Sequence, residues 1–375
     1  MLRDGLPQSG SLAGDPSLAQ RAEQQRGHGG SRLRLQLSVF ALAILVPAAL
    51  FAWWLRMDGM RTASAREDPR IRATLHPEDI GAVIAWGSEL VQQGRLEDAG
   101  RLFAQAAQTD PHDARPFALL GALALKQGKP AYARVNFEQA ARDNPSDPDV
   151  WDALGNLYAN SSLRSKAPAA FERVVSLRPG DVTAWRKLGL LLEEGGHYTA
   201  GRKALEKALS LAPADGDIQD DLARNDLLLG SERQAEQLYA TVLATRPQDP
   251  VALVGSAEAM LRRKVSAADL ALAQRRVEMA LQRLDSGHSH LILGRILLAR
   301  KLYPQSVAEL KKALQRNPGE PNPYAFLARA YQAMGNTAQA QQEAASYRNA
   351  LTKLSLGESK QPASNSAAAN ATRPR

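Results

Sequence analysis

Apolar residues recur at helical spacing along most of this chain, in short segments that come in pairs. In the clearest pair, one face of the first predicted helix carries Trp151, Leu154, Gly155 and Tyr158. The second predicted helix carries Ala167, Ala170, Phe171 and Val174, and it ends before Pro179, which cannot continue a helix. The small residue in the first helix lets the second helix approach closely. The pattern therefore predicts a series of helical hairpins.

These hairpins repeat with a regular period. The prolines that close them lie 34 residues apart, at Pro111, Pro145, Pro179, Pro213 and Pro247, and Pro318 follows 71 residues later. A small residue keeps nearly the same interval at Gly87, Gly121, Gly155, Gly189, Ala223, Ala257, Gly294 and Ala328. Self-similarity of this length is typical of a solenoid of stacked hairpins. The unit at 248–284 is longer and lacks its closing proline, so it is a candidate for a local bend or a contact.

One hairpin matches a known repeat almost residue for residue. The pattern Trp-x2-Leu-Gly-x2-Tyr, Ala-x3-Phe and Pro is met by Trp151, Leu154, Gly155, Tyr158, Ala167, Phe171 and Pro179. In these residues the chain resembles the tetratricopeptide repeat (TPR) family. The resemblance implies an all-α fold, a right-handed α-solenoid of about eight helix-turn-helix units over residues 78–352. It also implies a surface that binds proteins or peptides.

An uncharged apolar run precedes the repeats. Residues 37–55 carry no charged side chain, and arginines stand near both ends of the run. This length is just enough to cross a hydrocarbon core of about 30 Å. Trp53 and Trp54 lie at one end, where amphipathic rings prefer the membrane interface. We therefore expect one transmembrane helix over residues 35–56. A buried helix of a soluble protein and a cleaved signal peptide are the competing interpretations.

The remaining segments are polar. We expect a disordered N-terminal segment at 1–34, a charged linker at 57–77 and a disordered tail at 353–375. Arginines are about equally numerous on the two sides of the apolar run, so charge alone hardly orients it. The early position of the run and the resemblance to single-span repeat proteins of bacterial envelopes favour the bacterial inner membrane. The N-terminus would then be cytoplasmic and the repeats periplasmic.

Charge and composition exclude some classes of partner. The formal net charge is +8, but most of the excess lies in the flanking segments and the repeats are nearly neutral. A nucleic-acid-binding domain usually carries a basic patch, so no nucleic acid partner is expected. The chain has no cysteine, which excludes disulfides and zinc–thiolate sites. No cofactor is expected, and the pattern leaves the oligomeric state open.

No motif in the chain indicates catalysis or a metal site. It has no glycine-rich phosphate loop, no His-Glu-x-x-His and no Gly-x-Ser-x-Gly. The paired histidines His288 and His290 are interpreted as polar residues at a helix start rather than as metal ligands. Two pairs of adjacent carboxylates are interpreted as solvated or groove-lining, Asp220-Asp221 and Glu193-Glu194. We therefore expect a protein that is not an enzyme.

The resemblance also assigns a partner-binding groove, because the first helix of each TPR unit lines a concave surface. The residues carried over are Asn156, Asn160, Arg186, Glu193, Asp220, Arg224, Arg262, Arg295 and Arg329. Asn156 and Asn160, one helical turn apart, are the strongest candidates to bind the backbone of an extended peptide. Some family members hold a chaperone's C-terminal carboxylate with a Lys-Asn-Asn-Lys-Arg clamp. That clamp is not matched here, because Asp152 stands where a lysine is needed.

These features together predict a non-enzymatic, membrane-anchored scaffold. It would bind proteins through its concave groove, within a bacterial cell-envelope assembly. The alternative is an accessory subunit of polysaccharide or surface-polymer synthesis or export that contacts a synthase or a glycan. A soluble cytoplasmic adaptor would require another explanation of the apolar run, and an enzyme would require a catalytic site that these motifs do not provide.

Overall fold

The computed structural model describes residues 68–263 and 266–355, which form seventeen α-helices and no β-strand. The prediction of an all-helical fold is confirmed for this part of the chain. The helices belong to two compact units, divided between His112 and Asp113. The transmembrane helix predicted at 35–56 and the segment at 1–34 lie outside the described residues. Within the described ranges, no helix has the length and apolar character needed to span a bilayer.

The first unit contains one predicted hairpin and a short helix before it. The described helices are α3 (Pro69–Leu75), α4 (Ile80–Gln92) and α5 (Leu96–Thr109). α4 and α5 form the hairpin. α3 lies inside the segment expected to be a linker, and its Ala73 is buried in one cluster with Val83 of α4. The expected linker therefore contains a helix that packs on the first hairpin.

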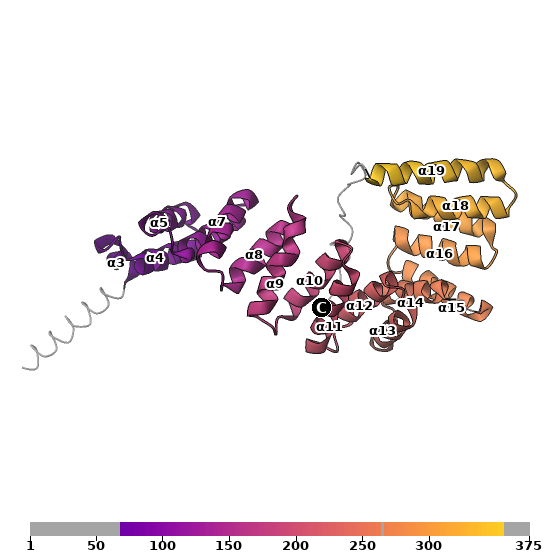
Figure 1. The fold of residues 1–375 in the computed structure, drawn as a ribbon, viewed down its shortest axis with the longest axis horizontal. Helices are drawn as coiled ribbons and strands as arrows, with labels where there is room; N and C mark the ends of the chain where they lie inside the picture. The colour runs from indigo at the N-terminus through magenta and orange to yellow at the C-terminus, as the bar shows by residue number, and fades with distance from the viewer. Residues whose placement is uncertain (1–67, 264–265, 356–375) are drawn as a thin grey trace, which may run out of the picture. The chain divides into compact units, whose positions relative to one another are not determined.

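The second unit contains seven helix pairs and one short 3-10 helix, η1 (Arg164–Lys166). The first helices of the pairs are α6 (Ala114–Lys126), α8 (Pro148–Ala159), α10 (Val182–Glu194), α12 (Gly216–Leu228), α14 (Pro250–Arg262), α16 (Gly287–Ala299) and α18 (Asn322–Ala333). The second helices are α7 (Pro130–Asp143), α9 (Ala167–Leu177), α11 (Tyr198–Leu211), α13 (Glu232–Thr245), α15 (Ala267–Leu281), α17 (Tyr303–Arg316) and α19 (Thr337–Ser355). Figure 1 shows the last two pairs, α16 to α19, stacked in chain order.

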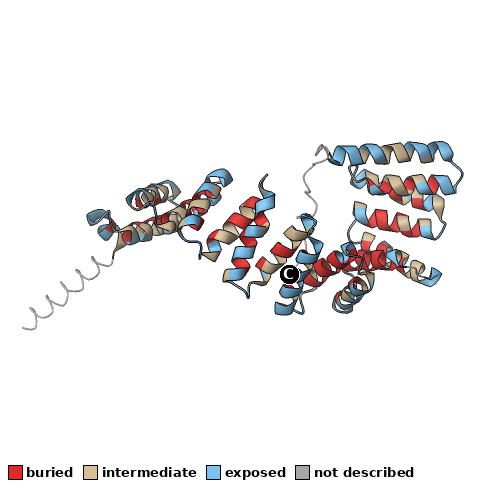
Figure 2. Ribbon diagram, in the orientation of Figure 1, coloured by how far each residue is buried: buried red, intermediate tan, exposed pale blue. Residues whose placement is uncertain are grey.

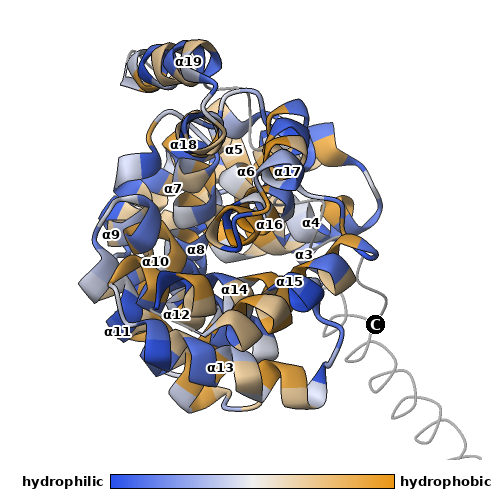
Figure 3. Cartoon of the chain, turned by 90° about the vertical axis from the view of Figure 1, so that its right-hand side faces the viewer, coloured by the Kyte–Doolittle hydropathy of each residue, from blue (hydrophilic) through white to orange (hydrophobic). Residues whose placement is uncertain are grey.

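The first helices of neighbouring pairs touch one another. Contacts run from α10 through α12, α14 and α16 to α18, so these helices form one layer of the second unit. Each second helix packs against its own partner and against the first helix of the next pair. This arrangement buries α14 and α16 along most of their length, and α16 is coloured mostly as hydrophobic (Figures 2 and 3). The resemblance places the groove on this layer of first helices.

An aspartate begins most of the first helices. Its side chain accepts hydrogen bonds from backbone N–H groups of the first turn at Asp79, Asp113, Asp147, Asp181, Asp215 and Asp249. Each aspartate satisfies a donor that the start of a helix leaves open. These aspartates lie at the same 34-residue interval as the prolines. Ser286 caps α16 in the same way, after the longer unit. The repeat therefore marks where most of the first helices start.

The small residue of each first helix is the point of close contact with the second helix. A Cβ atom added at Gly155 would lie 2.7 Å from Cε2 of Phe171, and one added at Gly189 would lie 2.7 Å from Cγ of Leu205. Phe171 and Leu205 are almost completely buried, so their side chains have little room to move aside. The predicted close approach of the two helices is confirmed at both positions.

We predict that Gly155→Ala destabilises the α8–α9 pair, because the added methyl group collides with the buried Phe171 ring. Overpacking of this kind costs roughly 1–3 kcal/mol. The higher helix propensity of alanine offsets about 1 kcal/mol of that cost, which leaves a net loss of up to about 2 kcal/mol. Urea unfolding combined with hydrogen exchange at α8 and α9 measures this loss.

Gly180→Ala is the matched control for this prediction. A Cβ atom added at Gly180 meets no other atom within 4 Å, so the substitution should leave stability nearly unchanged. Equal losses in the Gly155 and Gly180 variants would contradict the packing argument.

Candidate functional site

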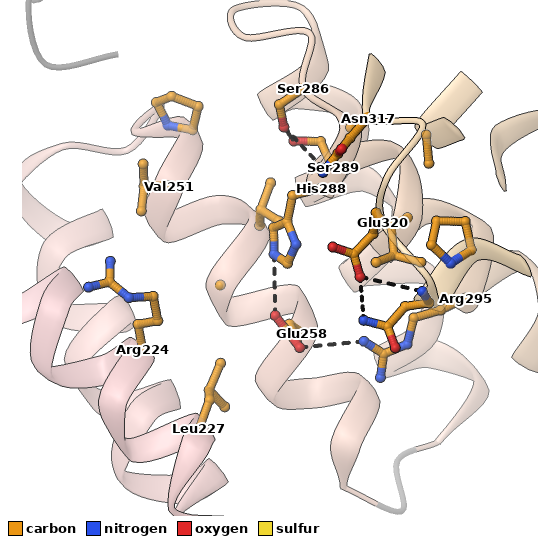
Figure 4. A pocket seen from close by; sticks show the side chains of 18 of the residues that line it. Arg224, Leu227, Val251, Glu258, Ser286, His288, Ser289, Arg295, Asn317 and Glu320 are labelled. Atoms are coloured by element: carbon orange, nitrogen blue, oxygen red, sulfur yellow. Dashed lines mark hydrogen bonds and ion pairs between the residues drawn. The ribbon is translucent and has the colours of Figure 1, made fainter. Parts of the chain in front are cut away.

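A cleft of about 750 Å³ opens on the layer of first helices in the second unit. Charged side chains of α10, α12, α14 and α16 line it. Residues of α13, α17 and α18 and of the segments before α16 and α18 complete it. Figure 4 shows Glu258 and His288 pointing toward one another, with Arg295 beside them and Arg224 on a separate helix. Four helices thus bring charges of both signs into one open space.

Glu258 is the carboxylate at the centre of this cleft. It is only 8% exposed, and its Oε1 accepts hydrogen bonds from Nη2 and Nε of Arg262 at 2.7 and 3.1 Å. Nη1 of Arg295 lies 3.4 Å from the same oxygen, and Nε2 of His288 lies 3.4 Å from Oε2. Burial alone would raise the pKa of Glu258, but His288 and Arg262 lower it to about 2. The carboxylate is therefore held ionised by three basic side chains.

Of the two arginines that bond to Glu258, Arg295 makes the fewer and longer hydrogen bonds to this carboxylate. Its side chain is 20% exposed, and its guanidinium carbon lies 5.1 Å from the centre of the Phe326 ring. Burial lowers the pKa of Arg295 below its ordinary value, in spite of the nearby Glu258 carboxylate. The neighbouring cations Arg262 and Arg329 act in the same direction.

Arg224 and Glu193 form a second charged group in the cleft. Nε of Arg224 donates to Oε1 of Glu193 at 2.9 Å, and Nη1 lies 3.1 Å from Oδ1 of Asp221. Burial alone would lower the pKa of Arg224, but Asp221 and Glu193 raise it above its ordinary value. Two carboxylates therefore compensate this arginine, which distinguishes it from Arg295.

Uncharged side chains line the rest of the cleft. Val251 and Leu227 lie on one side in Figure 4, and Ser286, Ser289 and Asn317 lie on the other. Val251 is exposed although its side chain is large and apolar. The hydroxyl oxygens of the two serines are 2.7 Å apart. A bound chain segment would therefore meet apolar contacts on one side and hydrogen-bonding groups on the other.

Four predicted groove residues line this cleft: Glu193, Arg224, Arg262 and Arg295. Arg329 of α18 is exposed outside the cleft, with its guanidinium carbon 5.4 Å from the centre of the Phe326 ring. Asp220 is buried and pairs at 3.5 Å with Arg246, the residue that follows α13. Its neighbour Asp221 is also buried, so the interpretation of these two carboxylates as solvated is wrong. An arginine from outside α12 reaches each carboxylate: Arg246 pairs with Asp220, and Arg186 of α10 pairs with Asp221.

The other three predicted residues lie on α8, at its C-terminal end and on α10, and they have partners within the chain. Nδ2 of Asn156 donates to the carbonyl and the carboxylate of Asp152 at 2.8 and 2.9 Å, and Oδ1 accepts from Nζ of Lys187 at 3.0 Å. Nδ2 of Asn160 donates to the carbonyl of Asn156 at 2.9 Å. Arg186 pairs with a buried aspartate of α12 at 2.6 Å. Binding of a peptide by Asn156 and Asn160 stays a prediction.

The two histidines have different partners. His288 faces Glu258, a contact that the sequence did not predict. His290 is buried, with Nδ1 at 2.6 Å from Oε2 of Glu309 and Nε2 at 2.8 Å from Oδ1 of Asp285. No group of three or more potential metal-binding side chains occurs in the part of the chain that the structure describes. His288 therefore belongs with the charged groups of the cleft.

Two family models match the chain, and both describe the tetratricopeptide repeat. One matches residues 154–224, and the other matches 90–157 and 297–353. Among solved structures, a chain of the APC/C hetero-tetramer Cut9-Hcn1 is 16% identical with a TM-score of 0.51, over 73% of this chain and 54% of that chain. This likeness shows the fold alone.

Two further solved structures have lower TM-scores than the Cut9-Hcn1 chain. YrrB, described as a TPR protein with an unusual peptide-binding site, is 18% identical with a TM-score of 0.46, over 49% of this chain and 95% of that chain. A tetratricopeptide repeat protein from Parabacteroides merdae ATCC 43184 is 17% identical with a TM-score of 0.46, over 67% of this chain and 98% of that chain. No curated protein matches the chain.

We predict that Glu258→Gln destabilises the protein in a pH-dependent way. The pKa of Glu258 is lowered from 4.5 to about 2 on folding, so its contribution is fully present above pH 4.5. It is lost as the pH falls from 4.5 toward 2, because the unfolded chain then takes up a proton that the folded carboxylate does not. At about 1.4 kcal/mol per pKa unit, the variant should lose up to about 3 kcal/mol at pH 7.

Urea unfolding of the intact protein and the variant at several pH values between 7 and 3 measures this difference. Glu194→Gln is the control, because Glu194 is exposed and its substitution should change stability by less than about 0.5 kcal/mol. A difference between wild type and Glu258→Gln that stays constant across this pH range would contradict the assigned ion pairs.

Proposed function

We propose that this chain, which belongs to the tetratricopeptide repeat family, is a non-enzymatic scaffold that binds a partner protein through the cleft on its first helices. One observation carries the proposal: charged and exposed apolar side chains gather in an open cleft on one layer of the solenoid. Repeat proteins use such layers as extended binding surfaces. The volume of the cleft is enough for several side chains of a bound segment.

The lining of the cleft favours a peptide over a glycan. A sugar ring would need an open aromatic face on which to stack. Here the Phe326 ring lies within 5.1 and 5.4 Å of the guanidinium groups of Arg295 and Arg329, and Tyr239 is buried. A peptide backbone, by contrast, can bond to the hydroxyl and amide groups on one side of the cleft and lay apolar side chains against Val251.

The proposal includes an anchor in the bacterial inner membrane. The uncharged apolar run at 37–55, with tryptophans at one end and arginines near both ends, supports a single-pass helix over 35–56. The early position of this run supports a cytoplasmic N-terminus and periplasmic repeats. The scaffold would then hold its partner beside the membrane, within a cell-envelope assembly.

We predict that a double substitution in the cleft, Leu228→Asp/Val251→Asp, abolishes partner capture. Both side chains are exposed, so the fold should survive, while two new carboxylates would disrupt the apolar side of the cleft. Crosslinking in cells followed by pull-down and mass spectrometry compares this variant with the intact chain. The variant should lose the partners that the intact chain retains.

The matched control for this experiment is Tyr132→Asp/Val135→Asp. These residues are exposed apolar side chains on α7, away from the cleft lining. This variant should capture the same partners as the intact chain. Loss of partners from the α7 variant, with capture by the cleft variant unchanged, would place the binding surface elsewhere.

We predict that the intact chain stays in the membrane fraction after a carbonate wash. Deletion of residues 35–56 should move it to the soluble fraction, because the apolar run supplies the anchor. Protease added to sealed spheroplasts should digest the repeats if they are periplasmic. An intact chain released by carbonate would contradict the anchor, and repeats protected from protease would contradict the orientation.

A further inference from the structure

We infer that His290 forms a proton-operated latch between α16 and α17, and that its protonation holds the start of α16 in the position that shapes the cleft. The latch consists of His290, Asp285 in the segment before α16, and Glu309 on α17. It gives the cleft a pH-dependent regulation, and in that respect it rests on the proposed function. The three residues of the latch lie outside the cleft lining.

The imidazole ring of His290 lies between two carboxylates and is largely closed off from water. Its Nδ1 lies 2.6 Å from Oε2 of Glu309, and its Nε2 lies 2.8 Å from Oδ1 of Asp285. The residue is only 7% exposed, so water has little access to either contact. A neutral imidazole has one N–H group and one bare nitrogen, whereas a protonated imidazole has two N–H groups. Only the protonated ring can donate to both carboxylates at once.

Each carboxylate of the latch also pairs with a cation through its other oxygen. Oε1 of Glu309 accepts from Nζ of Lys312 at 2.8 Å, and Oδ2 of Asp285 pairs with Arg316. Arg316 and then His290 lower the pKa of Asp285 below its ordinary value. Lys312 and Arg316 are 53% and 55% exposed, so water screens their charges, while the ring lies buried. Both carboxylates therefore act as acceptors, and the proton between them belongs to the ring.

The other helices that pack against α16 place no hydrogen bond or ion pair on His290, among the residues that the structure describes. Their charged side chains have other contacts: Glu258 of α14 pairs with His288, Arg276 of α15 contacts Met260, and Arg329 of α18 lies over the Phe326 ring. A change in the charge of the ring therefore acts first on Asp285 and Glu309.

Loss of the ring proton removes one of the two hydrogen bonds. The bare nitrogen then faces a carboxylate oxygen at 2.8 Å or less, and both of these atoms are acceptors. Leaving a buried acceptor without a donor is costly, so one of the two contacts opens. Either Glu309 of α17 or Asp285 in the segment before α16 then moves away from the ring.

The latch adjoins the part of α16 that lines the cleft. Asp285 directly precedes Ser286, whose side chain caps α16 by accepting a hydrogen bond from the N–H of Ser289 at 3.1 Å. Ser286, His288 and Ser289 all line the cleft (Figure 4). A movement of Asp285, or of the start of α16 relative to α17, therefore moves these side chains.

Proton uptake and closure of the latch favour each other. Both contacts of the ring are closed in the structure, which requires the protonated form. The latch therefore opens as the pH rises through the titration of His290. A partner that binds the cleft with the latch closed should bind more weakly over the same pH interval, and its binding should in turn favour the protonated ring.

The first test observes the ring itself in the intact purified chain. The protein is labelled with 15N-histidine, and long-range 1H–15N NMR spectra are recorded between pH 5 and pH 9. The chain has six histidines, and the signals that disappear in His290→Gln belong to His290. We expect two N–H nitrogens at the acid end and one N–H with one bare nitrogen at the alkaline end. A ring that keeps the same protonation throughout would overturn the inference.

The second test observes the cleft. Because the chain has no cysteine, Val251→Cys gives a single site in the cleft for an environment-sensitive fluorophore. Its emission should shift with pH at the same midpoint as the ring of His290. In Glu309→Gln this shift should be lost, because an amide can donate to a bare nitrogen as well as accept from an N–H. Neutral and protonated rings then both keep two partners.

Two further variants are the matched controls for the second test. Lys312→Gln removes an exposed cation from the other oxygen of Glu309 and should retain the emission shift. His288→Gln removes the histidine that lies in the cleft itself, and it should also retain the shift. Loss of the shift in His288→Gln would assign the pH response to His288 and overturn the inference.

The latch and the proposed function can fail separately. If the ring titrates but the emission does not shift, or if the shift persists in Glu309→Gln, the latch does not control the cleft and the inference is wrong. Partner capture, compared between the intact chain and Leu228→Asp/Val251→Asp, tests the binding function without reference to the latch. The NMR test uses the intact chain, so it does not depend on the folding of the Glu309 variant.

Discussion

The second unit depends on the close approach of two helices at a residue that has little or no side chain. At Gly155 and Gly294, a single added carbon would collide with Phe171 and Leu310 of the partner helix. Because each second helix fills the space between its own partner and the next pair, the first helices of neighbouring pairs are left in contact with one another. That layer is where the cleft opens. The packing of the hairpins therefore determines which side chains are available for binding.

The charges on this layer differ in how well they are compensated. Arg224 is matched by two carboxylates, and the buried Asp226 pairs with Arg202 at 2.6 Å. In the cleft, one carboxylate is shared by Arg262 and Arg295, and His288 lies beside it. Breaking a buried ion pair by removing one partner is costly, whereas an exposed ion pair contributes little to stability. The ion pairs of the cleft are therefore shared among more side chains than the pair between Asp226 and Arg202.

The sequence predicted the hairpins well, because each hairpin needs a small residue where its helices pack closely and a proline where its second helix has ended. Both residues recur at a nearly regular interval along the chain. The same period also contains the capping aspartates, such as Asp147 and Asp181, which could have been used to place each helix start. Burial of Asp220 was not predictable, because it depends on Arg246, which follows the second helix of the same pair. The contact between His288 and Glu258 depends on how α16 begins after a unit of unusual length, and the period alone does not specify that.

The most direct measurement is site-specific photocrosslinking of the intact chain in cells. A photoreactive residue is placed at Val251, which is exposed in the cleft, and in a second strain at Val135, which is exposed on α7. If the partner binds in the cleft, position 251 forms a discrete adduct with a partner protein and position 135 forms none. An adduct from position 135 with none from position 251 would contradict binding in the cleft, because the partner would then bind the second helices instead of the layer of first helices.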